Sequence, residues 1–187
     1  MPTLSVESAL IALIPEAENL VSCYRARYDP GAALGVPAHV TVLYPFKPPE
    51  DITDDILATL QNIFGGHPAF GVTFERTMEF PDTLFLEPDP AEPFRALTRA
   101  IAAAYPETPP YGGAFKEIVP HLTVAQTEDP EEMDRIKADF RVDCANGLPI
   151  ETQVREIVLM DNASGRWEVR ARFPLADAQL DQREKGF

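Results

Sequence analysis

Short apolar segments alternate with amphipathic segments from the start of the chain. Ser8 to Ile14 is a continuous apolar run typical of a buried strand, and Pro15 to Arg27 opens with proline and acidic residues, as helices do. Ala38 to Tyr44 contains several β-branched residues and ends at a proline, which predicts a second strand. Asp51 to Phe64 has apolar residues at helical spacing and is followed by two glycines, so a second helix is expected there.

The same alternation continues to the end of the chain. Phe70 to Phe80 alternates between apolar and polar residues and, with Leu84 to Leu86, predicts a β-hairpin. Apolar residues recur at helical spacing from Glu92 to Tyr105. A loop rich in proline and glycine follows, and beyond it we expect a strand, a helix and a last hairpin: Val119 to Ala125, Pro130 to Phe140, and Ile150 to Met160 with Trp167 to Leu175.

The order of these elements is similar in the two halves of the chain. It predicts a duplicated α+β architecture, with two similar lobes joined near residues 106–114. Residues 1–176 are expected to form one domain, and residues 177–187 a polar tail. No repeat of the sequence itself is visible beyond one short motif.

The charge of the chain limits its possible partners. The 187 residues include 30 acidic and 16 basic residues, for a net charge of −14. A field of this sign repels polyanions, so we expect no tight, non-specific binding of long nucleic acid. A small anionic substrate is still compatible, because its binding depends on local geometry.

The two cysteines and the N-terminal segment indicate an intracellular protein. Cys23 and Cys144 lack the spacing of a redox or zinc motif and are expected to be reduced thiols. The apolar run Ala9 to Ile14 is too short for a signal sequence or a membrane span. We therefore expect a soluble, cytoplasmic monomer with no membrane partner.

One motif occurs twice and carries the candidate chemistry. His39-Val40-Thr41-Val42 is echoed by His121-Leu122-Thr123-Val124, each shortly after a proline and each within an expected strand. The chain has three histidines, and two of them gaining threonine at this spacing by chance is about a one-in-a-hundred event. Because side chains alternate along a strand, His39 and Thr41 should share one face, with Val40, Val42 and Tyr44 pointing the other way, into the core.

Each residue type of the motif suits phosphoryl chemistry. Imidazole has an unperturbed pKa of about 6.5, so one neutral and one protonated histidine can act as general base and general acid. The hydroxyls of Thr41 and Thr123 can donate hydrogen bonds to phosphate oxygens. Two histidines at opposite protonation states predict a bell-shaped rate profile with an optimum between roughly pH 5.5 and 7.5. The sequence does not say which histidine is the base.

The paired motifs resemble those of the two-histidine (2H) phosphoesterase superfamily, in its 2′-5′ RNA ligase-like and cyclic phosphodiesterase branch. The resemblance is carried by the segments around the two motifs and by a closing hairpin: residues 38–46, 119–125, 157–159 and 165–167. It implies a bilobal, pseudo-symmetric fold in which two mainly antiparallel sheets form a central cleft, with helices outside. It also implies hydrolysis of 2′,3′-cyclic phosphates or 2′-5′ phosphodiesters, on a small nucleotide or an RNA end, with no metal and no cofactor.

Further candidates lie near the motifs in the sequence. An aromatic or basic side chain there could bind the base or phosphate of a substrate. Those considered are Tyr44, Phe46, Lys47, Arg76, Tyr111, Phe115 and Lys116. For Tyr44 and Phe46 a core position is the simpler interpretation, and for the charged side chains a solvated surface position. The third histidine, His67, lacks the threonine and is given no catalytic role.

Two alternatives are weighed against this enzyme. A nucleotide-binding or RNA-binding module could keep the cleft and lose turnover, although the motifs retain both histidines and both threonines. A zinc enzyme could use His39 and His121 as ligands, but a catalytic zinc normally needs three protein ligands, and neither motif offers a third.

Overall fold

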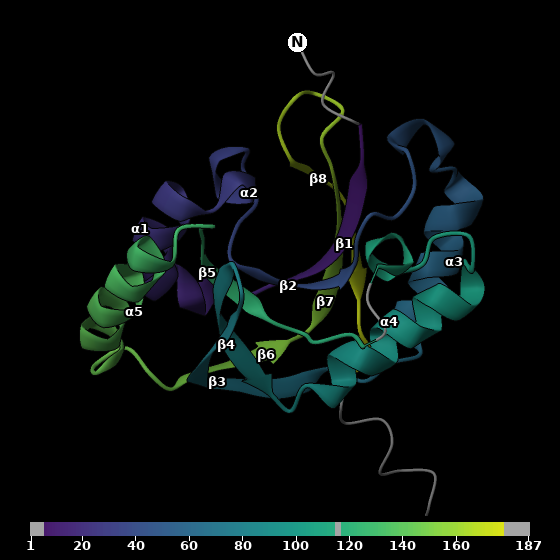
Figure 1. Cartoon of the computed structure of the whole chain (residues 1–187). Coiled ribbons are helices and arrows are strands. Elements are labelled where there is room, and N and C mark those ends of the chain that lie inside the picture. The colour runs from purple at the N-terminus through teal and green to yellow at the C-terminus, as the bar shows by residue number, and fades with distance from the viewer. Residues whose placement is uncertain (1–5, 115–116, 178–187) are drawn as a thin grey trace, which may run out of the picture.

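The computed structural model describes residues 6–114 and 117–177 and contains two four-stranded antiparallel sheets (Figure 1). The expected α+β fold with two antiparallel sheets is confirmed. The first sheet has the strand order β2 (His39–Leu43), β1 (Ser8–Leu13), β7 (Glu156–Asp161) and β8 (Glu168–Pro174). The second has the order β5 (Leu122–Gln126), β4 (Thr83–Asp89), β3 (Phe70–Phe80) and β6 (Ile150–Val154).

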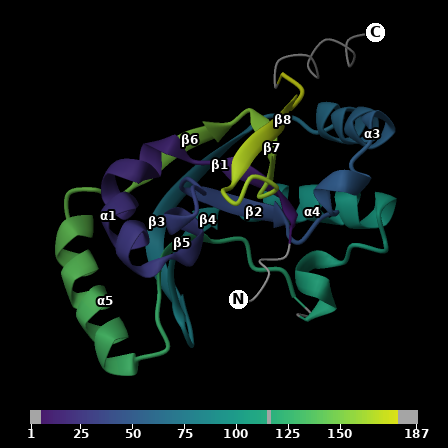
Figure 2. The same cartoon turned by 90° about the horizontal axis from the view of Figure 1, so that it is seen from above.

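The helices lie on two opposite sides of the sheets (Figures 1 and 2). They are α1 (Glu18–Tyr28), the short α2 (Pro30–Ala33), α3 (Asp54–Gly65), α4 (Glu92–Ala104) and α5 (Pro130–Cys144). Single 3-10 turns occur at Pro15–Ala17, Pro49–Asp51 and Pro110–Gly113. Helix α1 packs against β5, α4 against β2 and α3 against β8. Over the described residues, no helix has both the length and the apolar character that crossing a membrane requires.

Each sheet contains an equivalent strand-helix-strand unit, but the two sheets do not correspond to the two halves of the chain. The motif strands β2 and β5 are edge strands. Each pairs with the strand to which a helix connects it, giving the equivalent units β1-α1-β2 and β4-α4-β5. Each sheet takes strands from both sides of residues 106–114. The division expected near 106–114 therefore does not coincide with a division between sheets, and a single domain over 1–176 stays a prediction.

Two expected strands differ from those observed. Ile150 to Met160 is not one strand: the chain leaves the second sheet after β6, passes Arg155 and enters the first sheet as β7. Strand β5 begins at Leu122, so His121 lies just before the strand, not within it. The preceding Pro120 has no N–H to donate to a sheet, which is consistent with this late start.

Both motif strands contain a bulge at the same position. In β2, Thr41 lies opposite Ile11 and Leu43 opposite Leu10, so one extra residue is inserted between them. In β5, Thr123 lies opposite Phe85 and Ala125 opposite Leu84, with the same one-residue excess. A bulge of this kind shifts the alternation of side chains by one position. The expectation from strict alternation therefore fails beyond each threonine.

The position of Tyr44 shows the consequence. Val42 and Leu43 are both buried in the main core, and Tyr44 packs on a smaller cluster on the other face of the first sheet. That smaller cluster contains Ile11, which pairs with Thr41. Tyr44 thus lies on the same face as the motif side chains, and the expectation that it points into the core is wrong.

The buried hydroxyl of Thr98 connects helix α4 to the bulge of β2. Its Oγ1 lies 2.7 Å from the carbonyl oxygen of Val42 and 3.0 Å from that of Phe94, and the residue is 1% exposed. We predict that Thr98→Val, which keeps the side-chain shape, lowers the free energy of unfolding by about 1 to 3 kcal/mol, because the Val42 carbonyl loses a donor in the core. Urea denaturation measures this change. Thr59→Val is the control and should change little. Thr59 is exposed on α3, and its hydroxyl donates to the carbonyl oxygen of Asp55 in the same helix. Equal losses in both variants would contradict the prediction.

Candidate active site

His39 is oriented by the backbone just before it. It is the first residue of β2, opposite Leu13, and its Nδ1 lies 2.7 Å from the carbonyl oxygen of Pro37. A carbonyl can only accept a hydrogen bond, so Nδ1 carries the proton. In the neutral ring, Nε2 is then the basic nitrogen, available to a substrate.

His121 repeats this geometry in the other sheet. Its Nδ1 lies 2.8 Å from the carbonyl oxygen of Val119, again two residues earlier in the chain. The ring packs edge-on to Phe80 and beside Phe85, with centroid separations of 5.2 and 5.3 Å. The two histidines thus share one tautomer and one mode of anchoring, which the repeated sequence motif alone does not reveal.

Burial shifts the protonation of both rings. It lowers the pKa of His39 to about 4, against an opposing contribution from the Pro37 carbonyl, and the positive charges of Arg25 and His121 lower this pKa further. Asp29 acts in the opposite direction. The pKa of His121 is also lowered by burial, and the Val119 carbonyl partly offsets this. Both rings are therefore neutral at pH 7 in the free protein.

The structure brings the two motifs together at the centre of the molecule. Strands β2 and β5, the edges of the two sheets, lie side by side. The positive charge of His121 contributes to lowering the pKa of His39, after burial and the charge of Arg25. Thr41 and Thr123 are half-buried, like both histidines. Val40 and Leu122, which separate each histidine from its threonine, are buried. That both rings reach one phosphorus atom stays a prediction.

Tyr111 connects the two motifs from the loop that precedes the second one. Its N–H donates to the carbonyl oxygen of Tyr44 at 2.6 Å, and its phenol interacts with the side chain of Thr41. Burial raises the pKa of its phenol. The backbone of Tyr111 is left-handed, with φ of 52°, which is uncommon for an aromatic residue and marks a position held by its surroundings. The structure therefore places this candidate at the motifs.

A pocket of about 740 Å³ opens beside His121. Tyr111, Thr83 and Gln126 contribute polar groups to its lining, and Phe80 contributes an apolar wall. Gln126 stands five residues after His121, as Tyr44 stands five residues after His39, and the matching bulges put both on the motif face of their sheets. The sequence reasoning missed Gln126, and the equivalent spacing is the one feature that could have indicated it.

The other wall of this pocket is acidic. Asp82, Glu117 and Glu128 line it, and Asp82 and Glu128 also line a neighbouring pocket on the side of α1 and α2. Carboxylates at these positions oppose the approach of additional phosphates. The pocket favours a ligand with few negative charges.

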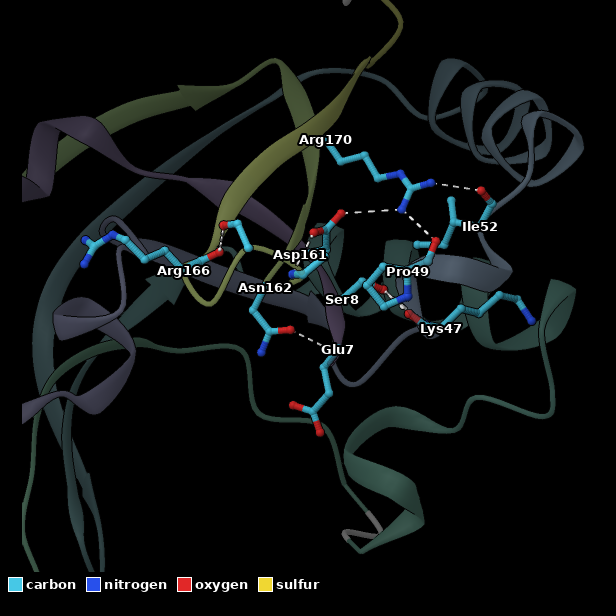
Figure 3. A network of polar contacts seen from close by, with 11 residues as sticks. Glu7, Ser8, Lys47, Pro49, Ile52, Asp161, Asn162, Arg166 and Arg170 are labelled. Carbon is cyan, nitrogen blue, oxygen red and sulfur yellow. Dashed lines mark hydrogen bonds and ion pairs between the residues drawn. The ribbon is translucent and has the colours of Figure 1, made fainter. Parts of the chain in front are cut away.

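Tyr44 is held by Glu7, which belongs to a polar network at the start of β1 (Figure 3). The Tyr44 hydroxyl donates to Glu7 at 2.5 Å, and burial together with this carboxylate raises the pKa of Tyr44 to about 12. The N–H of Glu7 is held by Asn162 Oδ1 at 2.7 Å. The ring of Tyr44 packs against Trp167, so Tyr44 is a neutral, well-supported member of the motif face.

The same network fixes the loop that follows β2 (Figure 3). The hydroxyl of Ser8 donates to the carbonyl oxygen of Lys47 at 2.6 Å. The guanidinium of Arg170 donates to the carbonyl oxygens of Pro49 and Ile52 at 2.7 and 3.0 Å. The end of β2 is thereby connected to β1 and β8.

The remaining candidates have separate outcomes, and Arg76 is paired with Glu87 at 2.9 Å. Phe46 is 4% exposed and packs edge-on to Tyr105 in the core, so it cannot contact a substrate, and its core interpretation holds. Lys47 is paired with Glu107 at 2.5 Å. Phe115 and Lys116 lie outside the described residues. Within those residues, no cluster of three histidine, cysteine or acidic side chains could hold a metal ion.

Comparisons with known proteins agree with the class that the fold and the paired motifs define. A protein of Bacillus pumilus is 27% identical over 89% of this chain and 96% of its own length, and one of Bacillus licheniformis is 25% identical over 88% and 96%; both are named "Putative phosphoesterase". The solved structure of the protein TT0787 of Thermus thermophilus covers 92% of this chain and 99% of its own, with a TM-score of 0.62 and 19% identity. E. coli LigT in complex with NADP+ covers 93% and 99%, with a TM-score of 0.55 and 17% identity.

Residues 13–166 match the 2′-5′ RNA ligase superfamily. The chain belongs to this family, and the resemblance stated from its two motifs is confirmed. The solved structures show that its two-sheet fold is that of LigT.

The lowered pKa of His39 predicts how the protein titrates. Because its folded-state pKa of about 4 lies below the unfolded value of about 6.5, the unfolded chain binds a proton that the folded chain does not between these values. We expect the His39 ring signals in NMR to remain those of a neutral imidazole from pH 7 to pH 5. The contribution of His39 to the free energy of unfolding should fall as pH drops from about 6.5 to about 4. A His39 ring that is half-protonated near pH 6.5 would contradict the buried environment.

Proposed function

We propose that this protein is a metal-independent phosphoesterase that hydrolyses 2′,3′-cyclic phosphates or 2′-5′ phosphodiesters by paired-histidine acid-base catalysis. The observation that carries the proposal is the repeated anchoring of His39 and His121, each with Nδ1 on the carbonyl two residues earlier. His39 is the first residue of one of two adjoining edge strands, and His121 directly precedes the other. Both Nε2 atoms are thereby prepared for proton transfer.

The reaction needs one histidine in each protonation state. A neutral ring removes the proton of the attacking water through Nε2, and a protonated ring gives a proton to the departing sugar oxygen. At neutral pH both rings of the free protein are neutral, because burial lowers both pKa values. A bound phosphate anion favours the protonated form of a nearby imidazole, so the substrate itself supplies the condition for the second role.

The threonines and Tyr111 supply neutral hydrogen-bond donors for the phosphate. Thr41 and Thr123 lie on the motif face, two residues after their histidines, and the side chain of Thr41 interacts with the phenol of Tyr111. Donors directed at the oxygens where charge develops stabilise the transition state in a site with limited access to water. We assign catalytic roles to the two histidines and two threonines, and substrate contacts to Tyr44 and Tyr111. Phe115 and Lys116 remain predictions from the sequence.

The relatives support a nucleotide as the substrate. E. coli LigT has been solved in complex with NADP+, with 3′-AMP and with ATP, in structures that share the fold of this chain. The acidic pocket wall and the net charge of −14 favour a small nucleotide or a short RNA end over long nucleic acid. The cytoplasmic location and monomeric state remain predictions.

A turnover assay tests this function directly. The purified protein is incubated with 2′,3′-cyclic AMP and with a 2′-5′-linked dinucleotide, with and without EDTA. We expect hydrolysis that EDTA does not reduce, and a loss of about 10²-fold or more in both His39→Ala and His121→Ala, since each removes one proton-transfer group. His67→Ala is the matched control and should keep its activity.

Three outcomes would contradict the proposal. Binding of these nucleotides in calorimetry without turnover would identify a binding module. Loss of activity in EDTA that zinc or manganese restores would identify a metal enzyme. Full activity in either catalytic histidine variant would remove the proposed mechanism.

The lowered histidine pKa values also change the expected pH optimum. In kcat/KM, which reports the free enzyme, the acid limb should lie near pH 4 and the alkaline limb below about pH 6.5. The optimum then falls between these values, and the whole profile is shifted to lower pH relative to that of unperturbed imidazoles. The profile of kcat should lie at higher pH, because the bound anion raises both pKa values. The limbs describe the pair, not single residues. A kcat/KM profile that is flat from pH 4 to 8, with chemistry limiting the rate, would contradict this prediction.

A further inference from the structure

Two arginines donate hydrogen bonds to backbone carbonyls at equivalent positions before the two histidines. Arg25 of α1 donates from Nη2 to the carbonyl oxygen of Val36 at 3.0 Å. Arg95 of α4 donates from Nε to the carbonyl oxygen of Ile118 at 3.2 Å. Each acceptor lies three residues before its histidine, and each arginine lies on the helix of the same strand-helix-strand unit.

These carbonyls lie where the sheets do not hold the backbone. Strand β2 begins at His39 and β5 at Leu122, so residues 36 and 118 precede both ladders. The next carbonyl along the chain, that of Pro37 or Val119, is the one that accepts from the histidine Nδ1. Fixing the first carbonyl restricts the second, because they belong to adjacent peptide units with few soft dihedrals between them.

Arg25 is held unusually firmly for a charged residue. It is 2% exposed, and its guanidinium contacts the carboxylate of Asp29 through both Nε and Nη2 at 2.9 Å. Burying such an ion pair gives little net stability compared with apolar packing, which points to a role in specifying local geometry. A second side chain of α1, Glu18, accepts from the N–H of Ala38 at 2.6 Å. Side chains of helix α1 thus form hydrogen bonds with the backbone on both sides of Pro37.

We propose that Arg25 and Arg95 are positioning residues for the two histidines. Each arginine fixes the carbonyl three residues before its histidine, and through the following carbonyl it holds the proton on Nδ1 and leaves Nε2 available to the substrate. The kinetic consequence rests on the proposed function, whereas the consequence for the ring tautomer does not. Supporting residues of this kind hold reacting groups in a productive orientation, and their loss reduces turnover without removing any reacting group.

The two arginines differ in their electrostatic effect. The charge of Arg25 lowers the pKa of His39, together with burial and the charge of His121, and Asp29 opposes it. The pKa of His121 is lowered by burial and raised by the Val119 carbonyl. The experiment therefore keeps the charge at position 25 and removes it at position 95.

The test reads the histidine tautomers by NMR of protein labelled with ¹⁵N-histidine, at a pH where both rings are neutral. Arg95→Met should shift the His121 ring from the Nδ1–H form towards a mixture of both tautomers and leave His39 unchanged. Arg25→Lys retains the partner of Asp29 but loses the fork geometry, and it should do the same to His39 alone. The controls are exposed arginines on the same helices, Arg99→Met on α4 and Arg27→Lys on α1, which should change neither ring.

Kinetics on a cyclic nucleotide give the second measurement. In Arg95→Met we expect kcat to fall about 10-fold with KM within about twofold, because the chemistry and not the binding depends on the ring orientation. Arg95→Lys, which can still donate one hydrogen bond, should recover part of this loss. A loss of folded protein alone would lower kcat without changing one histidine selectively, and the tautomer measurement separates the two.

Three results would overturn the proposal: unchanged tautomers in both arginine variants, equal changes at both histidines, or changes in the control variants. Selective tautomer changes in a protein without turnover on any substrate would support the positioning role and refute the proposed function. Turnover by the unaltered protein together with unchanged tautomers in the variants would support the proposed function and refute the positioning role.

Discussion

The hydrogen bond from each imidazole Nδ1 to the carbonyl two residues earlier is the interaction on which the rest of the site depends. It fixes the tautomer, because a carbonyl cannot donate, and it therefore determines which nitrogen remains for a substrate. The bond forms within one chain segment, so the two sheets can repeat it independently. The fold has only to bring two such segments together, which it does by making both motif strands edge strands that lie side by side.

The bulges explain why each edge strand presents a further polar side chain on the same face as the motif residues. An uninterrupted strand would place Tyr44 and Gln126 on the core face, opposite His39 and His121. The extra residue in each strand moves both to the motif face while two successive apolar residues stay buried. Each half of the site thus gains one more polar side chain. The two positions are equivalent in the two sheets, but one holds a tyrosine and the other a glutamine.

The sequence predicted the elements and the motif pair well, and it failed where contacts between distant segments decide the outcome. Hydrophobic periodicity places most of the helices and strands, and the repeated motif led to the family that the comparisons show. Periodicity says nothing about which sheet a strand joins, so the change of sheet at Arg155 was missed. It also assumes unbroken alternation, which the bulge before Tyr44 violates. Arg25 and Arg95 have no motif of their own, since their partners are backbone carbonyls that any sequence supplies.

The charge of the protein and the neutrality of its site are complementary. A strongly negative chain attracts no anion at long range, and the Debye length of about 8 Å at physiological ionic strength limits this repulsion to phosphates close to the surface. At the motifs, burial keeps the histidines neutral, and the hydroxyl groups nearby donate hydrogen bonds without adding charge. In the proposed function, one bound phosphate raises the pKa of a nearby imidazole, so that the ring takes up the proton that the reaction needs. On the same proposal, each further phosphate would meet the carboxylates of Asp82, Glu117 and Glu128 with no comparable compensation, which favours a substrate with few phosphates.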